Sequence, residues 1–114
     1  MNLIQPKEIE INGKKYILSK FPAMDGREIM RRYAILEKQR MNNENSTIEG
    51  GDRDLINLVM KYVAISLPDG RPLSLTTETL IDNHVPDWMA LTRLEAEIVK
   101  YNSDPLDEGR LLNS

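Results

Sequence analysis

The sequence has 114 residues, a formal net charge of −3 and no cysteine, so it is the size of one domain and excludes disulfides and thiolate metal sites. Its first residues, MNLIQPKEIEI, lack the basic start and apolar run of a signal peptide, and no segment has the roughly 18 apolar residues of a membrane helix. We therefore expect a soluble, cytoplasmic protein that has no membrane partner.

Residues 7–18, KEIEINGKKYIL, contain Asn12 and Gly13 between two alternating runs, which predicts a β-hairpin with a type I′ turn. A two-residue turn places Ile11 opposite Lys14. One face of the hairpin then carries the apolar side chains of Ile9, Ile11, Tyr16 and Leu18. Two strands alone are only marginally stable, so this face needs a helix or a partner to cover it.

The segment after the hairpin predicts a helix from about residue 25 to residue 41. Asp25 is followed three residues later by Glu28, which resembles a capping box at a helix N-terminus. Apolar residues then recur at helical spacing, at Ile29, Tyr33 and Leu36. Residues 42–52 are rich in turn and breaker residues and predict a flexible loop.

Residues 53–67, RDLINLVMKYVAISL, predict a second helix with Asp52 as its N-cap. Its apolar side chains cover well over half of the helix circumference: Leu55, Ile56, Leu58, Val59, Tyr62, Val63 and Ile65. A helix with this pattern is either central in the core or partly covered by another protein. For the second alternative, the predicted partner-binding residues are Leu55, Ile56, Val59, Met60 and Val63.

The remaining chain predicts a turn, a short helix over about 77–83 and a final helix over about 86–102. The final helix carries an apolar stripe made of Trp88, Leu91, Leu94, Ile98 and Tyr101. Residues 103–114 predict a flexible tail. The sequence thus predicts one α+β domain over residues 1–102, mostly α, in which the N-terminal β-hairpin packs on a small bundle of about four helices.

The stretch NHVPDWMAL, residues 83–91, contains the only histidine and the only tryptophan of the chain. His84 lies close to acidic residues, so a metal site, an acid–base pair and a partner contact are alternatives to a helix boundary. Pro86 suits the first position of a helix, Asp87 complements the helix dipole, and Trp88 begins the buried stripe. We interpret the stretch as a helix boundary.

The sequence shows no pattern that catalysis or a bound cofactor requires. A single histidine cannot supply a histidine-based metal site, and the chain has neither a nucleophile elbow nor a glycine-rich phosphate loop. We therefore predict no catalytic residue, no metal ligand and no cofactor, and a protein that is not an enzyme.

Positive charge is concentrated in residues 14–41, where eight Lys/Arg against three Asp/Glu give +5 and leave −8 for the rest of the chain. The segment is a nucleic-acid arm, one of two complementary faces that bring copies together, or a solvated helix face. Arg27 and Arg31 share a helix face with Lys38 close by, as phosphate binding requires. Because no aromatic residues interleave with these charges, a nucleic-acid-binding regulator that uses residues 14–40 is the alternative rather than the leading hypothesis.

Five internal methionines lie in or beside the predicted helices: Met24, Met30, Met41, Met60 and Met89. Methionine fills irregular gaps in a core, and it also suits surfaces that accept varied apolar partners. We prefer the core interpretation and keep the binding surface as the alternative.

Two stretches, EIEINGKKYILSKFPAMDGREIM and LIDNHVPDWMALTRLEAEIVKYN, resemble small tail assembly chaperones of long-tailed bacteriophages and their prophages. The resemblance implies a protein of the bacterial cytoplasm that binds the tape measure protein, a very long helical chain, and keeps it soluble until tail tube subunits polymerise around it. It also implies a contact with the tail tube protein through a longer, frameshifted form. A long helix with exposed apolar faces aggregates unless it is covered, and many copies of a small domain could stack along it.

Overall fold

The computed structural model describes residues 6–42 and 51–103, and within these ranges it has the predicted α+β fold, with four strands and four helices. The predicted loop falls mainly on residues 43–50 and the predicted tail on residues 104–114, which lie outside the described residues. In chain order the elements are β1 (Lys7–Ile11), β2 (Lys14–Leu18), α1 (Ala23–Asn42), α2 (Gly51–Met60), β3 (Val63–Ser66), β4 (Pro72–Ser74), α3 (Glu78–His84) and α4 (Trp88–Ser103).

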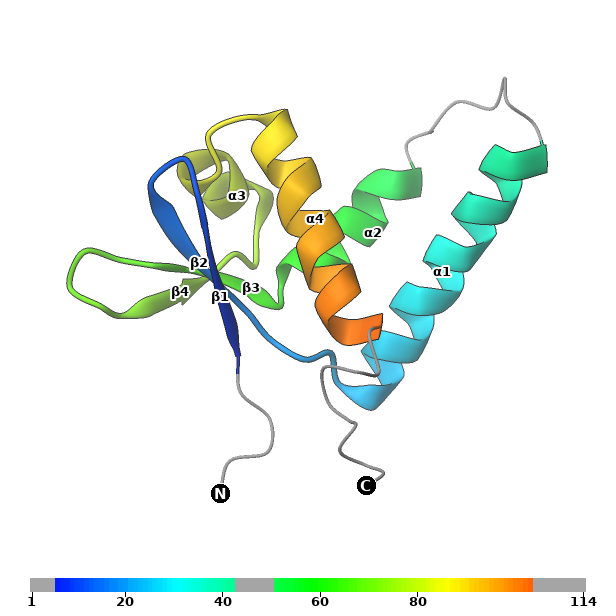
Figure 1. The fold of residues 1–114 in the computed structure, drawn as a ribbon, viewed down its shortest axis with the longest axis horizontal. Helices are drawn as coiled ribbons and strands as arrows, with labels where there is room; N and C mark the ends of the chain where they lie inside the picture. Colours follow the sequence, from blue (N-terminus) through cyan, green and yellow to red (C-terminus); the bar gives the residue numbers. More distant parts are fainter. Residues whose placement is uncertain (1–5, 43–50, 104–114) are drawn as a thin grey trace.

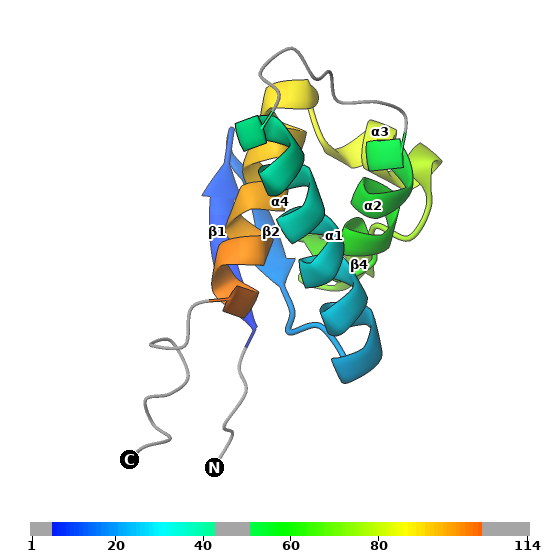
Figure 2. The ribbon, with the colours of Figure 1, turned by 90° about the vertical axis from the view of Figure 1, so that its right-hand side faces the viewer.

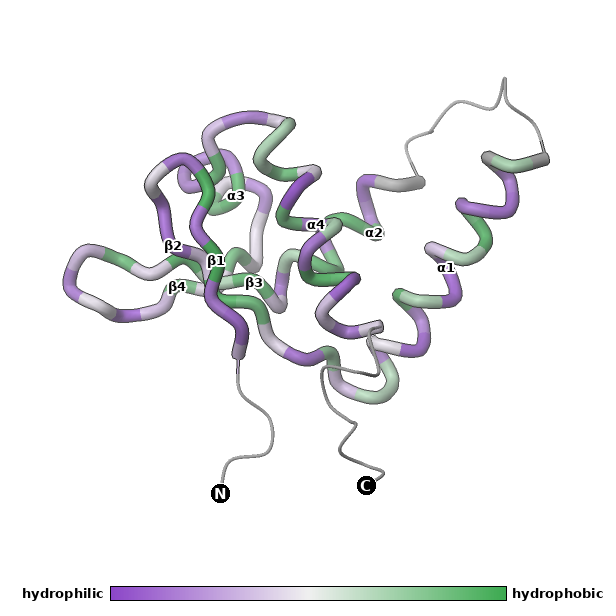
Figure 3. Tube along the Cα trace, in the orientation of Figure 1, coloured by the Kyte–Doolittle hydropathy of each residue, from purple (hydrophilic) through white to green (hydrophobic). Residues whose placement is uncertain are grey.

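The strands form one antiparallel sheet in the order β1-β2-β3-β4, and α4 lies between the β1–β2 hairpin and α1 (Figure 1). Turned by 90°, the molecule presents α1 at the front, with β1 on its left and α2 on its right (Figure 2). Hydrophilic residues recur along the whole of α1, whereas β3 is mainly hydrophobic (Figure 3).

The predicted β1–β2 hairpin is confirmed in its turn and in its register. Asn12 and Gly13 both have positive φ, 53° and 80°, as a type I′ turn requires. Ile11 pairs with Lys14, and the ladder continues with Glu10 opposite Lys15 and Ile9 opposite Tyr16. The face predicted to be apolar turns toward the core, where three of its residues are buried: Ile11, Tyr16 and Leu18.

The prediction of one helix over residues 53–67 is wrong. α2 ends at Met60, the amide of Tyr62 donates to the carbonyl of Val59 at 3.0 Å in a turn, and β3 follows. β3 pairs with β2 on one side and with β4 on the other. Periodicity alone does not separate a short buried strand from a helix segment. Pairing with β2 decides for the strand, because it satisfies main-chain groups that β2 would otherwise leave open. Asp52 is the second residue of α2 and not its predicted N-cap.

The predicted capping box at the start of α1 is not formed. α1 begins at Ala23, two residues before the predicted start, so Asp25 and Glu28 both lie inside the helix. Asp25 accepts a hydrogen bond from the hydroxyl of Tyr62, and Glu28 accepts one from Arg31 at 3.0 Å. The first of these bonds ties α1 to the turn that follows α2.

The interpretation of NHVPDWMAL as a helix boundary is confirmed, with the start of the helix displaced by two residues. α4 begins at Trp88, and the Oδ1 atom of Asp87 accepts a hydrogen bond from the amide of Ala90 at 2.9 Å. Asp87 therefore occupies the N-cap position, where a carboxylate both satisfies a main-chain donor and complements the helix dipole. Thr77 caps α3 in the same way, through the amide of Leu80 at 3.2 Å.

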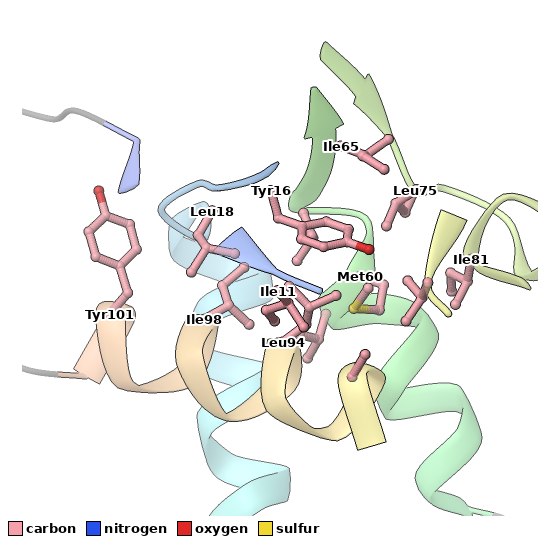
Figure 4. Close-up of a cluster of buried hydrophobic side chains, with 14 of the residues drawn as sticks. Ile11, Tyr16, Leu18, Met60, Ile65, Leu75, Ile81, Leu94, Ile98 and Tyr101 are labelled. Carbon is pink, nitrogen blue, oxygen red and sulfur yellow. The ribbon is translucent and has the colours of Figure 1, made fainter. Parts of the chain in front are cut away.

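α4 crosses one face of the sheet and closes the core with its buried side, which is formed by Ala90, Leu94, Ile98 and Tyr101. In Figure 4, Leu94 and Ile98 lie on the side of α4 that faces the strands, close to Leu18 of β2. The hydroxyl of Tyr16 donates to the main-chain oxygen of His84 at 2.6 Å and so links the sheet to the end of α3. The core is thus built from strands and helices that lie far apart in the sequence.

Candidate functional site

The residues predicted to bind a partner lie mostly in the core. Leu55, Val59, Met60 and Val63 have 2% or less of their surface exposed, and Ile56 is half-buried. The sequence left two alternatives for this segment, the centre of the core and a surface covered by another protein. The structure places it at the centre of the core. These side chains therefore present no continuous surface to another protein, and the candidate surface lies elsewhere.

Trp88 and Met89, in the first turn of α4, are large apolar side chains that the fold leaves in water. Trp88 is 73% exposed, so the prediction that it begins the buried stripe is wrong. The phase of the helix explains the error: Trp88 precedes Leu94 by six residues, which at about 100° per residue places the two side chains about 120° apart. A helical wheel centred on Leu94 and Ile98 would have placed Trp88 outside the core.

The second group of exposed apolar residues lies on α1. Met24 and Met41, near its two ends, are 80% and 74% exposed, and Ile35 is also exposed. Among residues 34–39 and 41, whose side chains the structure describes, Leu36 is the one that is partly buried. The C-terminal end of α1 diverges from α4 in Figure 1. We call residues 34–41 the distal half of α1.

A pocket of about 540 Å³ lies where the start of α1 meets the end of α4. Phe21, Ala23 and Met30 give it apolar walls, and Arg27 and Arg31 add two guanidinium groups. Gly26 is part of the wall because α1 passes close to Phe21 there: a Cβ atom at residue 26 would lie 3.1 Å from the Cβ atom of Phe21. We call this pocket the α1–α4 socket.

Asn102 of α4 also lines the socket and holds its parts together. Its Oδ1 atom accepts a hydrogen bond from the amide of Phe21 at 2.8 Å, and its Nδ2 atom donates to the carbonyls of Ser19 and Ile98 at 3.2 and 3.0 Å. These bonds fasten the link between β2 and α1 to the end of α4. The socket is therefore a fixed feature of the fold.

The histidine stretch contributes a structural contact between the sheet and α3. The polar contact found for His84 uses its main-chain oxygen, which accepts from Tyr16. Within residues 6–42 and 51–103, no group of three or more His, Cys, Asp or Glu side chains could hold a metal ion.

The basic residues predicted as a possible nucleic-acid arm do not form one surface. Lys14 begins β2, and the strand β2 lies on the side of α4 opposite to α1 (Figure 1). Lys20 donates to the carbonyl of Tyr101 at 2.8 Å, and its Nζ atom lies 4.0 Å from the centre of that ring. Arg31 is paired with Glu28. The positive charges are thus dispersed over several contacts, whereas a phosphate backbone is bound by a continuous basic surface.

One carboxylate has a strongly shifted pKa. Glu78, at the start of α3, accepts hydrogen bonds from Arg53 Nε at 2.8 Å and from Asn57 Nδ2 at 2.6 Å, both in α2. These bonds, that of Arg53 first, lower the pKa of Glu78 from 4.5 to about 2. Since the Arg53 side chain is largely exposed, the pair is a surface link between α2 and α3 and of modest strength.

We expect this link to make stability depend on pH. A carboxyl whose pKa is lower in the folded state than in the unfolded state stabilises the fold above about pH 4.5, and this contribution is lost as the pH falls toward about 2. The wild type should therefore be more stable than Glu78→Gln near neutral pH, and the difference should shrink steadily on acidification. Urea unfolding of both chains at several pH values measures it. A difference that does not change with pH would show that ionised Glu78 is not stabilised by its neighbours.

Across the helices of the described ranges, none combines the length and the apolar character needed to cross a membrane. Comparison of the chain with protein-family models, curated proteins and solved structures finds no match.

Proposed function

We propose that this chain is a tail assembly chaperone of a long-tailed bacteriophage or prophage, which binds the tape measure protein and keeps it soluble in the bacterial cytoplasm. It acts by binding and not by catalysis. Two independent features support the proposal: the resemblance of residues 8–30 and 80–102 to such chaperones, and the large apolar side chains that the fold leaves exposed on helices.

The observation that carries the proposal is the exposure of apolar side chains on the distal half of α1. Its apolar side chains Ile35 and Met41 face water, and only Leu36 among its described side chains is partly buried. Ile35 and Met41 are six residues apart, so their side chains lie about 120° apart around the helix. A partner that covered either of them would remove apolar surface from water.

A helical partner fits this surface better than an extended one. Helices pack side by side by placing the side-chain ridges of one into the grooves of the other, and they need no open main-chain groups on either side. The distal half of α1 offers such ridges, whereas an extended segment would need an exposed sheet edge. The tape measure protein, a long helical chain, has the required form.

The test is co-expression with the tape measure protein of the phage or prophage that encodes this chain, followed by measurement of that protein's soluble fraction. Wild type should raise the soluble fraction, and Met41→Glu should abolish most of the increase because it places a charge on the apolar contact. Met24→Glu is the matched control, since it makes the same change on the same helix at a similarly exposed position, outside the distal half. Equal increases with wild type and Met41→Glu would show that the distal half is not the binding surface. Absence of any increase with wild type would contradict the chaperone function itself.

A further inference from the structure

The α1–α4 socket combines apolar walls with positive charge. Three apolar residues form its walls, Phe21, Ala23 and Met30. The guanidinium groups of Arg27 and Arg31 also line it, and Arg31 is paired with Glu28, so Arg27 is the cation best placed to meet a ligand. The volume of about 540 Å³ lies within the roughly 300–1,000 Å³ that is usual for ligand sites. The socket therefore suits a ligand that carries an apolar group next to carboxylates.

The chain itself contains such a ligand directly after α4, in residues 104–108, DPLDE. Leu106 has Asp104 two residues before it, and Asp107 and Glu108 follow it. The segment thus carries three negative charges and no positive one. Its leucine matches the apolar walls of the socket, and its carboxylates match the positive charge there, because a guanidinium pairs with a carboxylate through two parallel hydrogen bonds.

The connection between the socket and this segment is short. Asn102 lines the socket, and α4 ends one residue later, at Ser103. Leu106 follows Asn102 by four residues, which span at most about 14 Å when extended. Pro105 disfavours helical geometry in the residue before it, in agreement with the end of α4 at this point. The chain can therefore leave the helix and return to the wall of the socket within a few residues.

A short connection also makes a weak contact sufficient. Two groups joined by a short linker meet at an effective concentration in the millimolar range. A segment held in this way fills its site in about half of the molecules even when the separate parts would bind with a dissociation constant of about 1 mM. The socket therefore does not have to bind the segment tightly in order to be occupied by it.

We propose that residues 104–108 dock in the α1–α4 socket of their own chain. Leu106 then lies between the apolar walls, and the carboxylates of Asp107 and Glu108 lie toward Arg27. The docked segment joins the end of α4 to the start of α1, and a partner that uses the socket has to displace it. Docking goes beyond the proposed function and does not depend on it, because the socket lies at the start of α1 and the distal half lies at the other end.

Two-dimensional proton–nitrogen NMR spectra of the full chain test the docking. Leu106→Asp replaces the apolar group by a charge and should lower the ratio of docked to free molecules roughly tenfold or more, the loss expected when a buried leucine contact is removed. The amide signals of Gly26, Arg27 and Met30 should then shift, although these residues lie far from residue 106 in the sequence. Leu111→Asp is the matched control, since it makes the same change outside the docked segment, and it should leave these signals in place.

Arg27→Glu tests the other side of the contact. It places a carboxylate opposite those of the docked segment, so the amide signals of Leu106 and Asp107 should move toward the positions typical of an unfolded chain. Lys38→Glu makes the same charge change farther along α1 and should leave them unchanged. Because docking occurs within one chain, the signals should not depend on protein concentration. Socket signals that are the same in wild type and in Leu106→Asp, or that change with protein concentration, would overturn the proposal.

Discussion

Replacing Tyr16 by alanine is expected to lower the free energy of unfolding by about 3–5 kcal/mol, the usual loss for a large aromatic side chain removed from a core. Tyr16 lies in β2, opposite Ile9 on one side and Ile65 on the other, and none of its surface is exposed. Removal of the Tyr16 side chain would leave a cavity in the core, between the sheet and the helices that pack on it. Urea unfolding followed by circular dichroism measures the loss.

Tyr16→Phe separates the hydroxyl from the ring. The ring stays in the core, and the hydrogen bond to the main-chain oxygen of His84, 2.6 Å long, is lost. We expect Tyr16→Phe to lower the free energy of unfolding by about 1 kcal/mol. The loss rises to about 3 kcal/mol if no water replaces the hydroxyl as the donor to the carbonyl of His84. If Tyr16→Ala cost no more than Tyr16→Phe, the ring would not occupy the core position that the fold assigns to it.

Leu94→Ala and Trp88→Ala both remove a large apolar side chain from α4. Leu94→Ala is expected to lower the free energy of unfolding strongly, and Trp88→Ala hardly at all. Leu94 is fully buried against the sheet, so its loss should cost about 2–5 kcal/mol. Trp88 is mostly exposed, and its loss should change the stability of the monomer by no more than about 0.5 kcal/mol. In a domain of this size 1 kcal/mol corresponds to several degrees in Tm, so thermal unfolding distinguishes the two variants readily.

The pair of variants checks the orientation of α4 as well as its stability. A rotation of the helix that buried Trp88 would expose part of the side that now contains Leu94 and Ile98, because Trp88 lies about 120° from Leu94 and about 80° from Ile98 around the helix. Trp88→Ala would then be the costly substitution, and Leu94→Ala the mild one. Measurement in dilute protein keeps association between copies out of the comparison.

The β1–β2 hairpin could be predicted from the sequence because its geometry is local. Asn12 and Gly13 select a type I′ turn by their tolerance of positive φ, and a two-residue turn fixes the register of both strands. The helix boundary before α4 was predictable for the same reason. Asp87 and Pro86 act on neighbouring main-chain groups, so the sequence alone shows where α4 has to begin to within two residues.

β3 could not be identified in this way because its partner is distant in the sequence. Val63 and Ile65 are buried and fit a strand, but the preceding residues of α2 are also apolar, and the combined run matches a buried helix. The pairing of Ile65 with Tyr16 decides between the two, and it joins segments almost 50 residues apart. Only the three-dimensional arrangement supplies that information.

The candidate binding surface differs from the one predicted from the sequence for a related reason. The excess of apolar residues in 53–67 was compatible with the centre of the core and with a surface for a partner, and the fold buries most of it. Within the described ranges, the large apolar side chains that remain exposed lie on two other helices, at Met24, Ile35 and Met41 of α1 and at Trp88 and Met89 of α4. Hydrophobic pattern alone shows how much apolar surface a chain carries, and the fold decides which part of it is left for partners.

The chaperone function has one direct test, the soluble fraction of the tape measure protein after centrifugation of cells that express it alone or together with the wild-type chain. We predict a clear increase in the supernatant on co-expression and recovery of both proteins in one complex. A tape measure protein that stays equally insoluble with and without this chain would contradict the proposed function.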